Sequence, residues 1–311
     1  MGDITIVTVN WHSAEWIRRL LRNLLQKSSG HHRLRCLILD NTNGIDAEAG
    51  GFAAEDIACS ISPINSQGLT GSRAHALALN KAMEIVQTEF VLIVDPDVHV
   101  FAQGWDSLCV DALSGQNAWA IGAPYPRWKV GKYHKFPSPV FCLFRRELAA
   151  RIPLDWRPYS NSFLCNAGVF AGRQIGRLGG LSSRRAYEQS SIVRGYSKTA
   201  EYLLGTFSPD TGWRISNAAR RRKLASVVFD DILPQNAAGL DVPLDPIWNE
   251  LAREFELFAF HGRLMLVHRY GTRGRPWKTA KGGDEAFWHS SIDKAERLLP
   301  VASESRSPGY E

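Results

Sequence analysis

The stretch Phe90-Val91-Leu92-Ile93-Val94-Asp95-Pro96-Asp97 decides the fold of this chain. Its apolar, largely β-branched first part predicts a short strand that is buried on both faces, as the strands of parallel sheets are. Asp and Pro favour turns, so we expect the strand to end after Val94. Ligands of such sheets bind beyond the carboxyl ends of the strands, and the stretch therefore places two carboxylates where a ligand would lie.

The residues before this stretch show the same alternation of strand and helix. Short apolar runs predict strands over residues 4–9, 36–39 and 56–61. Amphipathic segments predict one helix that begins after Ser13, with Ser13 as its cap, and a second helix over residues 71–86. This order predicts an α/β fold in which a mixed, mostly parallel sheet is flanked by helices.

The pattern loosens in the second half of the chain. Residues 157–205 combine many Gly, Ser and Arg residues with weak periodicity, and we interpret them as an insertion. Helices are expected over residues 210–223 and 285–299, and a hairpin with a break at Gly262 is expected over residues 255–268.

The composition excludes several classes of protein. The chain has 311 residues, of which 44% are hydrophobic and 22% charged, and this fits one large soluble domain rather than a disordered or collagen-like chain. It has no apolar run long enough to span a bilayer, and its start lacks the basic region of a signal peptide. Five cysteines without CxxC spacing indicate reduced thiols, so we expect a cytoplasmic protein. The net charge of +6 indicates an anionic partner: nucleic acid, a phosphorylated metabolite or a membrane surface.

Asp95 and Asp97 form the central candidate site. Two carboxylates two residues apart offer the hard oxygen ligands that Mg²⁺ or Mn²⁺ prefers, with substrate phosphates completing the coordination. The alternative is an ordinary turn that ends a strand. Asn10 and Asp40 follow the ends of two other predicted strands, so one crevice can collect them together with Asp95.

The chain resembles the family 2 type glycosyltransferases of the GT-A fold over about its first half. The segments that carry the resemblance, in the order of the family, are residues 4–13, 37–42, 65–74, 95–97 and 142–148. The resemblance implies a GT-A-like, Rossmann-like domain over residues 1–270, divided into a nucleotide-binding half (1–100) and an acceptor half (101–270). Residues 271–311 are then a C-terminal extension.

The resemblance also implies the residues of the donor site. Those expected to bind the sugar nucleotide are Thr8, Asn10, Asp40, Gly68, Arg73, Asp95 and Asp97. The expected metal ligands are Asp95, Asp97 and His268, with His261 in reserve, and the expected metal is Mg²⁺ or Mn²⁺. Asp40 can accept a hydrogen bond from a base, Arg73 can bind phosphate or form a structural ion pair, and Trp11 can stack on the base or pack in the core.

In the acceptor half, residues 207–214 resemble the segment that carries the catalytic base of the family, so Asp210 is the candidate base. A carboxylate there can remove the proton of an acceptor hydroxyl; the alternative role is a helix N-cap. Residues 220–223 are basic and either complement a helix dipole or contact anionic lipid. The arginines that can neutralise the diphosphate are Arg269, Arg273 and Arg275. The aromatic residues that either form a sugar-stacking wall or only pack are Trp128, Tyr133, Trp156 and Tyr159.

The resemblance therefore implies a metal-dependent glycosyltransferase that moves a sugar from a nucleoside diphosphate sugar to a hydroxyl of a glycan, polysaccharide or lipid-linked acceptor, with inversion. Nucleic acid is not an expected partner, while contact with the inner face of the membrane and the oligomeric state stay open. One alternative is a haloacid-dehalogenase-type phosphatase, in which Asp95 would be the nucleophile and Asp97 the acid/base. The later acidic pair of such a phosphatase would lie within residues 227–231. A nucleotidyltransferase and a non-catalytic basic binding protein are further alternatives.

Overall fold

The structure is a computed structural model of the chain. It describes residues 2–42, 44, 57–66, 68–159, 163–178, 184–270 and 285–300.

The larger of two sheets is mixed and mostly parallel. Its described strands lie in the order β3 (Ala58–Pro63), β2 (Arg33–Asp40), β1 (Asp3–Asn10), β4 (Phe90–Val94), β7 (Phe141–Arg145), β6 (Ala120–Ala123) and β8 (Ser226–Val228). β3, β2, β1 and β4 run parallel, whereas β7 is antiparallel to both of its neighbours. The chain builds outward from β1 to β3 and then returns beside β1 as β4, so the strand order reverses between β1 and β4. The expected α/β fold and its strands are thus confirmed.

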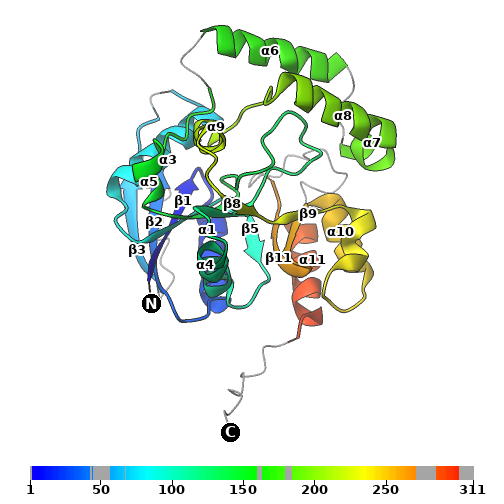
Figure 1. Ribbon diagram of the computed structural model, residues 1–311. Coiled ribbons are helices and arrows are strands. Elements are labelled where there is room, and N and C mark those ends of the chain that lie inside the picture. Colours follow the sequence, from blue (N-terminus) through cyan, green and yellow to red (C-terminus); the bar gives the residue numbers. More distant parts are fainter. Residues whose placement is uncertain are drawn as a thin grey trace.

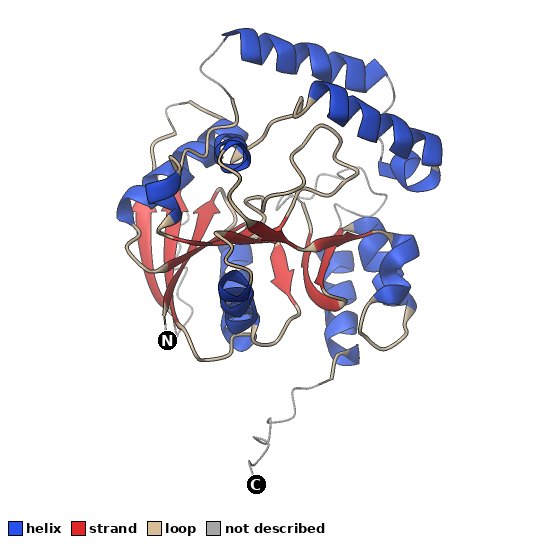
Figure 2. Ribbon diagram, viewed as in Figure 1, coloured by secondary structure: helices blue, strands red, loops and turns tan. Residues whose placement is uncertain are grey.

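Helices cover both faces of this sheet (Figures 1 and 2). On one face α1 (Ala14–Gln26) and α4 (Trp105–Gly115) pack against side chains such as Ile6 and Leu92. On the other face α3 (Ser72–Ile85) and α9 (Trp213–Arg221) pack against side chains such as Val7 and Ile93. Neighbouring residues of β1 and of β4 therefore contribute to different cores, as the alternation of side chains along a strand requires.

A smaller antiparallel sheet continues the structure beyond the end of β4. Its described strands lie in the order β5 (Val98–Val100), β11 (Arg263–His268), β10 (Glu256–Phe260) and β9 (Asp230–Ile232). β10 and β11 form the expected hairpin, with Gly262 in its turn. A short 3₁₀ helix, η1 (Pro234–Gly239), and α10 (Pro246–Glu254) pack against this sheet.

The expected C-terminal extension contains α11 (Glu285–Leu298), which packs on this small sheet together with α10. Trp288 and Ile292 of α11 are buried in one cluster with Trp248 and Leu251 of α10. This part of residues 271–311 is therefore built onto the core of the protein.

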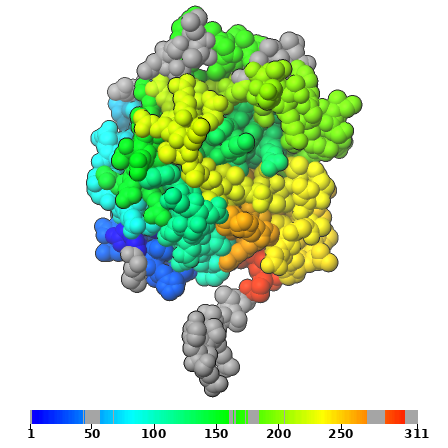
Figure 3. All heavy atoms as spheres, viewed as in Figure 1, coloured from blue at the N-terminus to red at the C-terminus, as the bar shows by residue number. Residues whose placement is uncertain are grey.

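The described residues of the segment 157–205 are largely helical, which the weak periodicity of the segment did not predict. They form α6 (Phe163–Leu178), α7 (Arg184–Gln189) and α8 (Ser191–Leu204), and α5 (Leu148–Arg151) precedes them. In the space-filling view this segment, coloured green to yellow-green, caps one end of the molecule (Figure 3). None of the described helices is long and apolar enough to cross a membrane.

Candidate functional site

Two sheets bring the Asp95-Pro96-Asp97 turn and His268 to one point. The turn carries the chain from the end of β4 in the larger sheet to the start of β5 in the smaller one. His268 is the last residue of β11 and is paired with Val98, the first residue of β5. The backbone amide of Arg269 also donates to the carbonyl oxygen of Asp97 over 3.0 Å. The pairing of β5 with β11 therefore holds the histidine beside the aspartates.

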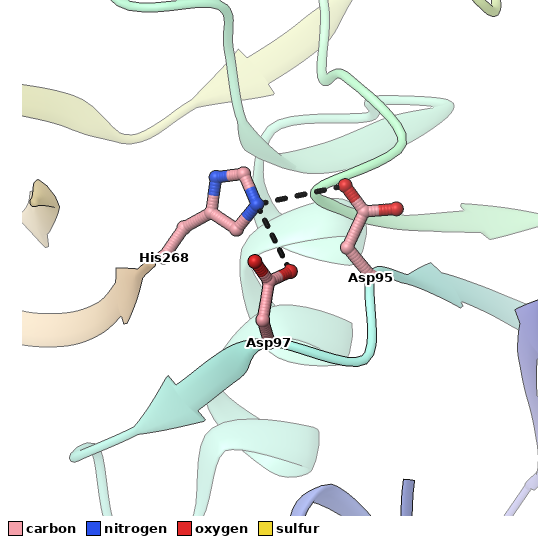
Figure 4. A group of neighbouring side chains, drawn as sticks. All are labelled: Asp95, Asp97 and His268. Atoms are coloured by element: carbon pink, nitrogen blue, oxygen red, sulfur yellow. Dashed lines mark ion pairs between the residues drawn. The ribbon is translucent and has the colours of Figure 1, made fainter. Parts of the chain in front are cut away.

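Asp95, Asp97 and His268 offer ligand atoms that all lie within 4.8 Å of one another. His268 Nε2 is 3.3 Å from Asp97 Oδ1 and 3.7 Å from Asp95 Oδ2 (Figure 4). His268 and Asp97 are buried, and Asp95 is partly open to solvent. Carboxylate oxygens and one imidazole nitrogen at this spacing fit a divalent metal ion. The three residues predicted as metal ligands are thus together, whereas the reserve candidate His261 lies in the turn at the other end of β11.

A buried carboxylate orients the histidine from behind. Glu256 lies directly opposite His268 in the hairpin, and His268 Nδ1 donates to Glu256 Oε2 over 2.9 Å. The other oxygen, Oε1, is 2.5 Å from the ammonium of Lys129, whose side chain is only 7% exposed. Lys129 Nζ lies 3.7 Å from the centre of the Tyr270 ring. Because the Nδ1 proton is held by Glu256, Nε2 is the nitrogen that is turned to Asp95 and Asp97, as in metal sites with a carboxylate behind the histidine.

The charges of this cluster support one another. Burial lowers the pKa of His268, but Asp97 and Glu256 outweigh it and raise the pKa to about 10. Burial raises the pKa of Glu256, but Lys129 and His268 outweigh it and lower the pKa to about 2. Without a metal ion the imidazole is therefore protonated, and a metal ion would take the place of the proton on Nε2.

A cavity of about 600 Å³ opens beside this cluster. It lies beyond the carboxyl ends of β1 and β4, where the strand order reverses and ligands of α/β sheets bind. Its size is within the range of small-molecule sites. The residues that line it are Val9, Trp11, Ser13, Asn41, Leu69, Thr70, Gly71, Ala74, His75, Asp95, Pro96, Asp97, His268 and Tyr270. We call it the donor cavity, after the sugar-nucleotide donor that the sequence resemblance implies.

The amino-terminal end of α3 faces the donor cavity. Gly71 precedes the helix with a φ of 57°, and no side chain caps the helix. Thr70 and Gly71 both line the cavity. Backbone amides at a helix start point outward and attract anions, so this wall can receive a phosphate group. His75, one turn into the helix, places Nε2 3.9 Å from Asp95 Oδ1.

The structure places Asn10 and Asp40 behind the donor cavity, not in its wall. Both side chains are fully buried, and Asn10 Nδ2 donates to Asp40 Oδ1 over 2.8 Å. Asp40 also accepts from the amide and hydroxyl of Thr42 and from the amide of Gly44. Burial raises the pKa of Asp40, but these hydrogen bonds outweigh the effect of burial, so the pKa lies below its usual range. In this structure Asp40 organises the loop after β2, and Asn41 is the residue that faces the cavity.

The loop after β1 is built in a similar way. Asn10 Oδ1 accepts from the amide of Ser13, and the Ser13 hydroxyl donates to the same oxygen. Ser13 is the N-cap residue of α1, as expected, but its side chain makes no capping hydrogen bond, because its hydroxyl is used inside the loop. Trp11 is 56% exposed and lines the donor cavity, so it does not pack in the core. Thr8 is fully buried within β1.

Two other predicted donor residues lie away from the cavity. Gly68, with a φ of 77°, precedes the lining residue Leu69 but does not line the cavity itself. The Arg73 guanidinium lies over the Tyr159 ring, 5.4 Å from its centre, and lines a second cavity. Arg269, expected near the diphosphate, is buried with its guanidinium over Trp16. The other two arginines of that prediction, Arg273 and Arg275, lie outside the described residues.

Asp210 is held in an ion pair near this site. Lys132 Nζ is 2.6 Å from Asp210 Oδ2, and Asp210 Oδ1 accepts from the Ser72 hydroxyl and from the amide of Thr211. Burial raises the pKa of Asp210, but Lys132 and these hydrogen bonds lower it to about 2. α9 begins after Gly212, so the alternative role of Asp210 as a helix cap is wrong. Asp210 does not belong to the described wall of the donor cavity.

Sequence reasoning missed the residues that support the site. Lys129 and Lys132 lie in the irregular segment 124–140 between β6 and β7, where no periodicity indicates which side chains turn inward. Glu256 could have been found, because a hairpin that turns at Gly262 pairs a residue near 256 with His268. Of the aromatic residues proposed for a sugar wall, Trp128 and Trp156 are buried in the protein interior. The acidic pair of the phosphatase alternative, Asp230 and Asp231, lies on β9, which β10 separates from β11.

No protein-family profile matches the sequence, and no curated protein sequence matches it. Among solved structures the chain is similar to the mannosyltransferase PcManGT from Pyrobaculum calidifontis, in complex with GDP-Man and Mn²⁺, with 17% identity over 70% of this chain and 69% of that chain and a TM-score of 0.40. It is similar to S. aureus TarS 1–349, with 10% identity over 74% of this chain and 94% of that chain and a TM-score of 0.40. It is also similar to glucosyl-3-phosphoglycerate synthase from Mycobacterium tuberculosis, with 13% identity over 56% of this chain and 67% of that chain and a TM-score of 0.36.

Proposed function

We propose that this chain is a metal-dependent glycosyltransferase that moves a sugar from a nucleoside diphosphate sugar to an acceptor hydroxyl, with inversion of configuration. The observation that carries the proposal is the group of Asp95, Asp97 and His268 in the wall of the donor cavity. A metal site, a helix start and the exposed Trp11 surround one space of suitable size for a sugar nucleotide. The sequence resemblance to family 2 type glycosyltransferases supports the interpretation of this combination as a site for a sugar nucleotide.

Asp95, Asp97 and His268 Nε2 would hold the metal ion. We infer Mn²⁺ rather than Mg²⁺, because the imidazole nitrogen is a softer ligand than the oxygens that Mg²⁺ prefers. When bound, the ion would neutralise the charge that develops on the departing nucleoside diphosphate. Glu256 keeps Nε2 directed at the site, and the start of α3 adds backbone amides for a phosphate group.

Asp210 is the base of the proposed reaction. Its low pKa keeps the carboxylate ionised at neutral pH, as a proton acceptor must be. The ion pair with Lys132 also makes it a weak base, so release of Lys132 when the acceptor binds would strengthen it. The acceptor is a glycan, a polysaccharide or a lipid-linked molecule, and we propose that the protein works in the cytoplasm, in contact with the inner face of the membrane where the acceptor is lipid-linked.

Calorimetry with UDP, GDP and dTDP in the presence of Mn²⁺ tests the proposal. At least one of the three should bind the wild-type chain, and Asp97→Ala should abolish the part of binding that depends on Mn²⁺. The exposed Asp241→Asn is the matched control and should bind as the wild type does. Absence of binding of all three nucleotides would contradict the donor site.

The role of Asp210 needs a second measurement. With the sugar nucleotide that binds, Asp210→Asn should keep its affinity and lose turnover, measured as release of the nucleoside diphosphate in the presence of acceptor. Unchanged turnover in Asp210→Asn would remove the base from the proposal and leave the donor site standing.

A further inference from the structure

A second cavity, of about 480 Å³, runs along a different face of α3. Arg73, Leu77 and Asn80 line it, and their spacing places them on one stripe of the helix. Leu69 lines both this cavity and the donor cavity, so the two spaces adjoin at the start of α3. No role has so far been assigned to this second cavity.

Three arginines converge in its wall. Arg157 and Arg214 both contact Asp155 Oδ2 at 2.7 Å, so their guanidinium groups lie side by side. Arg214 Nε also donates to the backbone oxygen of Tyr159, and the Tyr159 ring lies beneath the guanidinium of Arg73. Tyr159 and Asp155 therefore fix the three cations around one end of the cavity.

The charge of this end suits a phosphate monoester. Burial raises the pKa of Asp155, but hydrogen bonds from Arg157 and Arg214 outweigh it and keep the pKa below its usual range. One ionised carboxylate among three guanidinium groups leaves a net charge of +2, and no acidic residue is among the described residues of the cavity wall. A phosphate monoester carries a charge of about −1.5 to −2 at neutral pH, and the planar fork of arginine matches phosphate oxygens in pairs.

The rest of the wall is apolar. Leu69 and Leu77 from the α3 side face Pro158, and α6 contributes Val169 and Phe170. Phe170 remains 65% exposed, so the apolar wall continues from the cavity to the surface of the molecule. Such a path suits an apolar chain longer than the cavity itself, because each methylene group that leaves water adds to the affinity.

The cavity also lies next to the candidate base. Asp210 accepts from the hydroxyl of Ser72, the residue before Arg73, and Arg214, in the first turn of α9, follows Asp210 by four residues. We propose, on the basis of the glycosyltransferase function proposed above, that this cavity binds the acceptor and that the acceptor is a phosphate-bearing amphiphile. Its phosphate lies among Arg73, Arg157 and Arg214, and its apolar chain follows the α6 side of the cavity.

The test compares three probes by calorimetry on the full chain: decyl phosphate below its micellar concentration, inorganic phosphate and 1-decanol. The wild type should bind decyl phosphate at least about tenfold more tightly than either of the other two, because both ends of the probe contribute. Arg73→Gln and Arg157→Gln should each weaken decyl phosphate by about tenfold or more. Arg33→Gln, an exposed arginine at the start of β2, is the control and should change nothing.

A second pair of variants tests the apolar wall. Phe170→Ser should weaken the binding of decyl phosphate, whereas Ile192→Ser, which changes another exposed apolar residue, on α8, should not. Equal binding of inorganic phosphate and decyl phosphate would overturn the amphiphile, since only an anion site would remain. Unchanged binding of decyl phosphate in both arginine variants, or no binding by the wild type, would overturn the site.

Binding of Mn²⁺ with the nucleotide separates this proposal from the one on which it rests. In Arg73→Gln, Arg157→Gln and Phe170→Ser this binding should equal that of the wild type, which also shows that the three variants fold. Absence of nucleotide binding by the wild type would refute the donor site, and the decyl phosphate measurements would still test whether the second cavity binds the amphiphile.

Discussion

Replacing Glu256 by Gln removes a charge that contacts both His268 and Lys129. Glu256 accepts from His268 Nδ1 over 2.9 Å and lies 2.5 Å from Lys129 Nζ. Gln has the same length and keeps an oxygen that can accept the Nδ1 proton. The change is therefore mainly electrostatic, and it leaves Asp95 and Asp97 in place.

The structure gives the size of the effect on metal binding. With a divalent ion bound and the imidazole neutral, the ion, Lys129, Glu256 and the two aspartates sum to zero charge. Glu256→Gln turns this into a net +1 and so disfavours the ion. Loss of a carboxylate behind a metal-binding histidine costs about 10–100-fold in metal affinity, which is about 1.4–2.7 kcal/mol.

The single variant also leaves Lys129 buried without its carboxylate. Breaking a buried ion pair on one side costs about 3–5 kcal/mol of stability, so Glu256→Gln should melt at a lower temperature. The double variant Lys129→Met/Glu256→Gln removes both charges and should regain most of that stability. With the ion bound its cluster again sums to zero charge, so it should regain the part of the affinity that the net charge costs. It still lacks the carboxylate that raises the basicity of His268, and for that reason we expect it to bind the ion more weakly than the wild type.

The assay is Mn²⁺ titration followed by electron paramagnetic resonance, with calorimetry as a second readout. Thermal unfolding of each variant, and Glu147→Gln as an exposed control, show whether the protein is folded. A double variant that is as stable as the wild type and binds Mn²⁺ with wild-type affinity would refute the reasoning, since Glu256 would then not support His268.

The remaining predictions concern Asp210, Trp11 and the larger sheet. Lys132→Met should raise the pKa of Asp210 from about 2. A carboxylate with a depressed pKa stabilises the fold above its unfolded pKa, and this stabilisation is lost as the pH falls through its folded pKa. Urea unfolding should therefore show a lower free energy of unfolding for the variant at pH 7, and the difference from the wild type should disappear below about pH 2. Trp11→Ala should weaken nucleotide binding by about 1–3 kcal/mol in calorimetry, with thermal stability unchanged because the side chain is 56% exposed. Gly122→Ala should lower the stability severely in the same unfolding assay, because a Cβ there would meet the Phe141 carbonyl oxygen at 1.9 Å.

The strands and the position of Asp95 and Asp97 were predictable because both depend on short-range signals. β1 and β4 are continuous apolar runs that need no partner to be recognised, and each ends where turn-forming residues begin. Asp95 and Asp97 follow from the strand that precedes them. His268 was expected from the family resemblance, and the register of β11 with β5 brings it to the aspartates.

The orientation of side chains at strand ends was not predictable in the same way. Asp40 could face a ligand or its own backbone, and the choice depends on donors from Asn10, Thr42 and Gly44 that only the folded loops bring together. Arg73 could face either side of α3, and the Tyr159 ring, which is 86 residues away in sequence, decides the side. Long-range partners of this kind leave no local pattern.

The distribution of charge between the two cavities has a consequence for the order of binding. The described wall of the donor cavity contains no Lys or Arg, and without a metal ion its two aspartates outweigh the protonated His268. A nucleoside diphosphate is therefore repelled until a divalent ion neutralises the aspartates, and nucleotide and metal should bind together. The second cavity has the opposite sign, with a net +2 at its arginine end. An anionic acceptor would thus be attracted to its own cavity and kept out of the ion-free donor cavity, so electrostatics would direct the acceptor to its own side of α3.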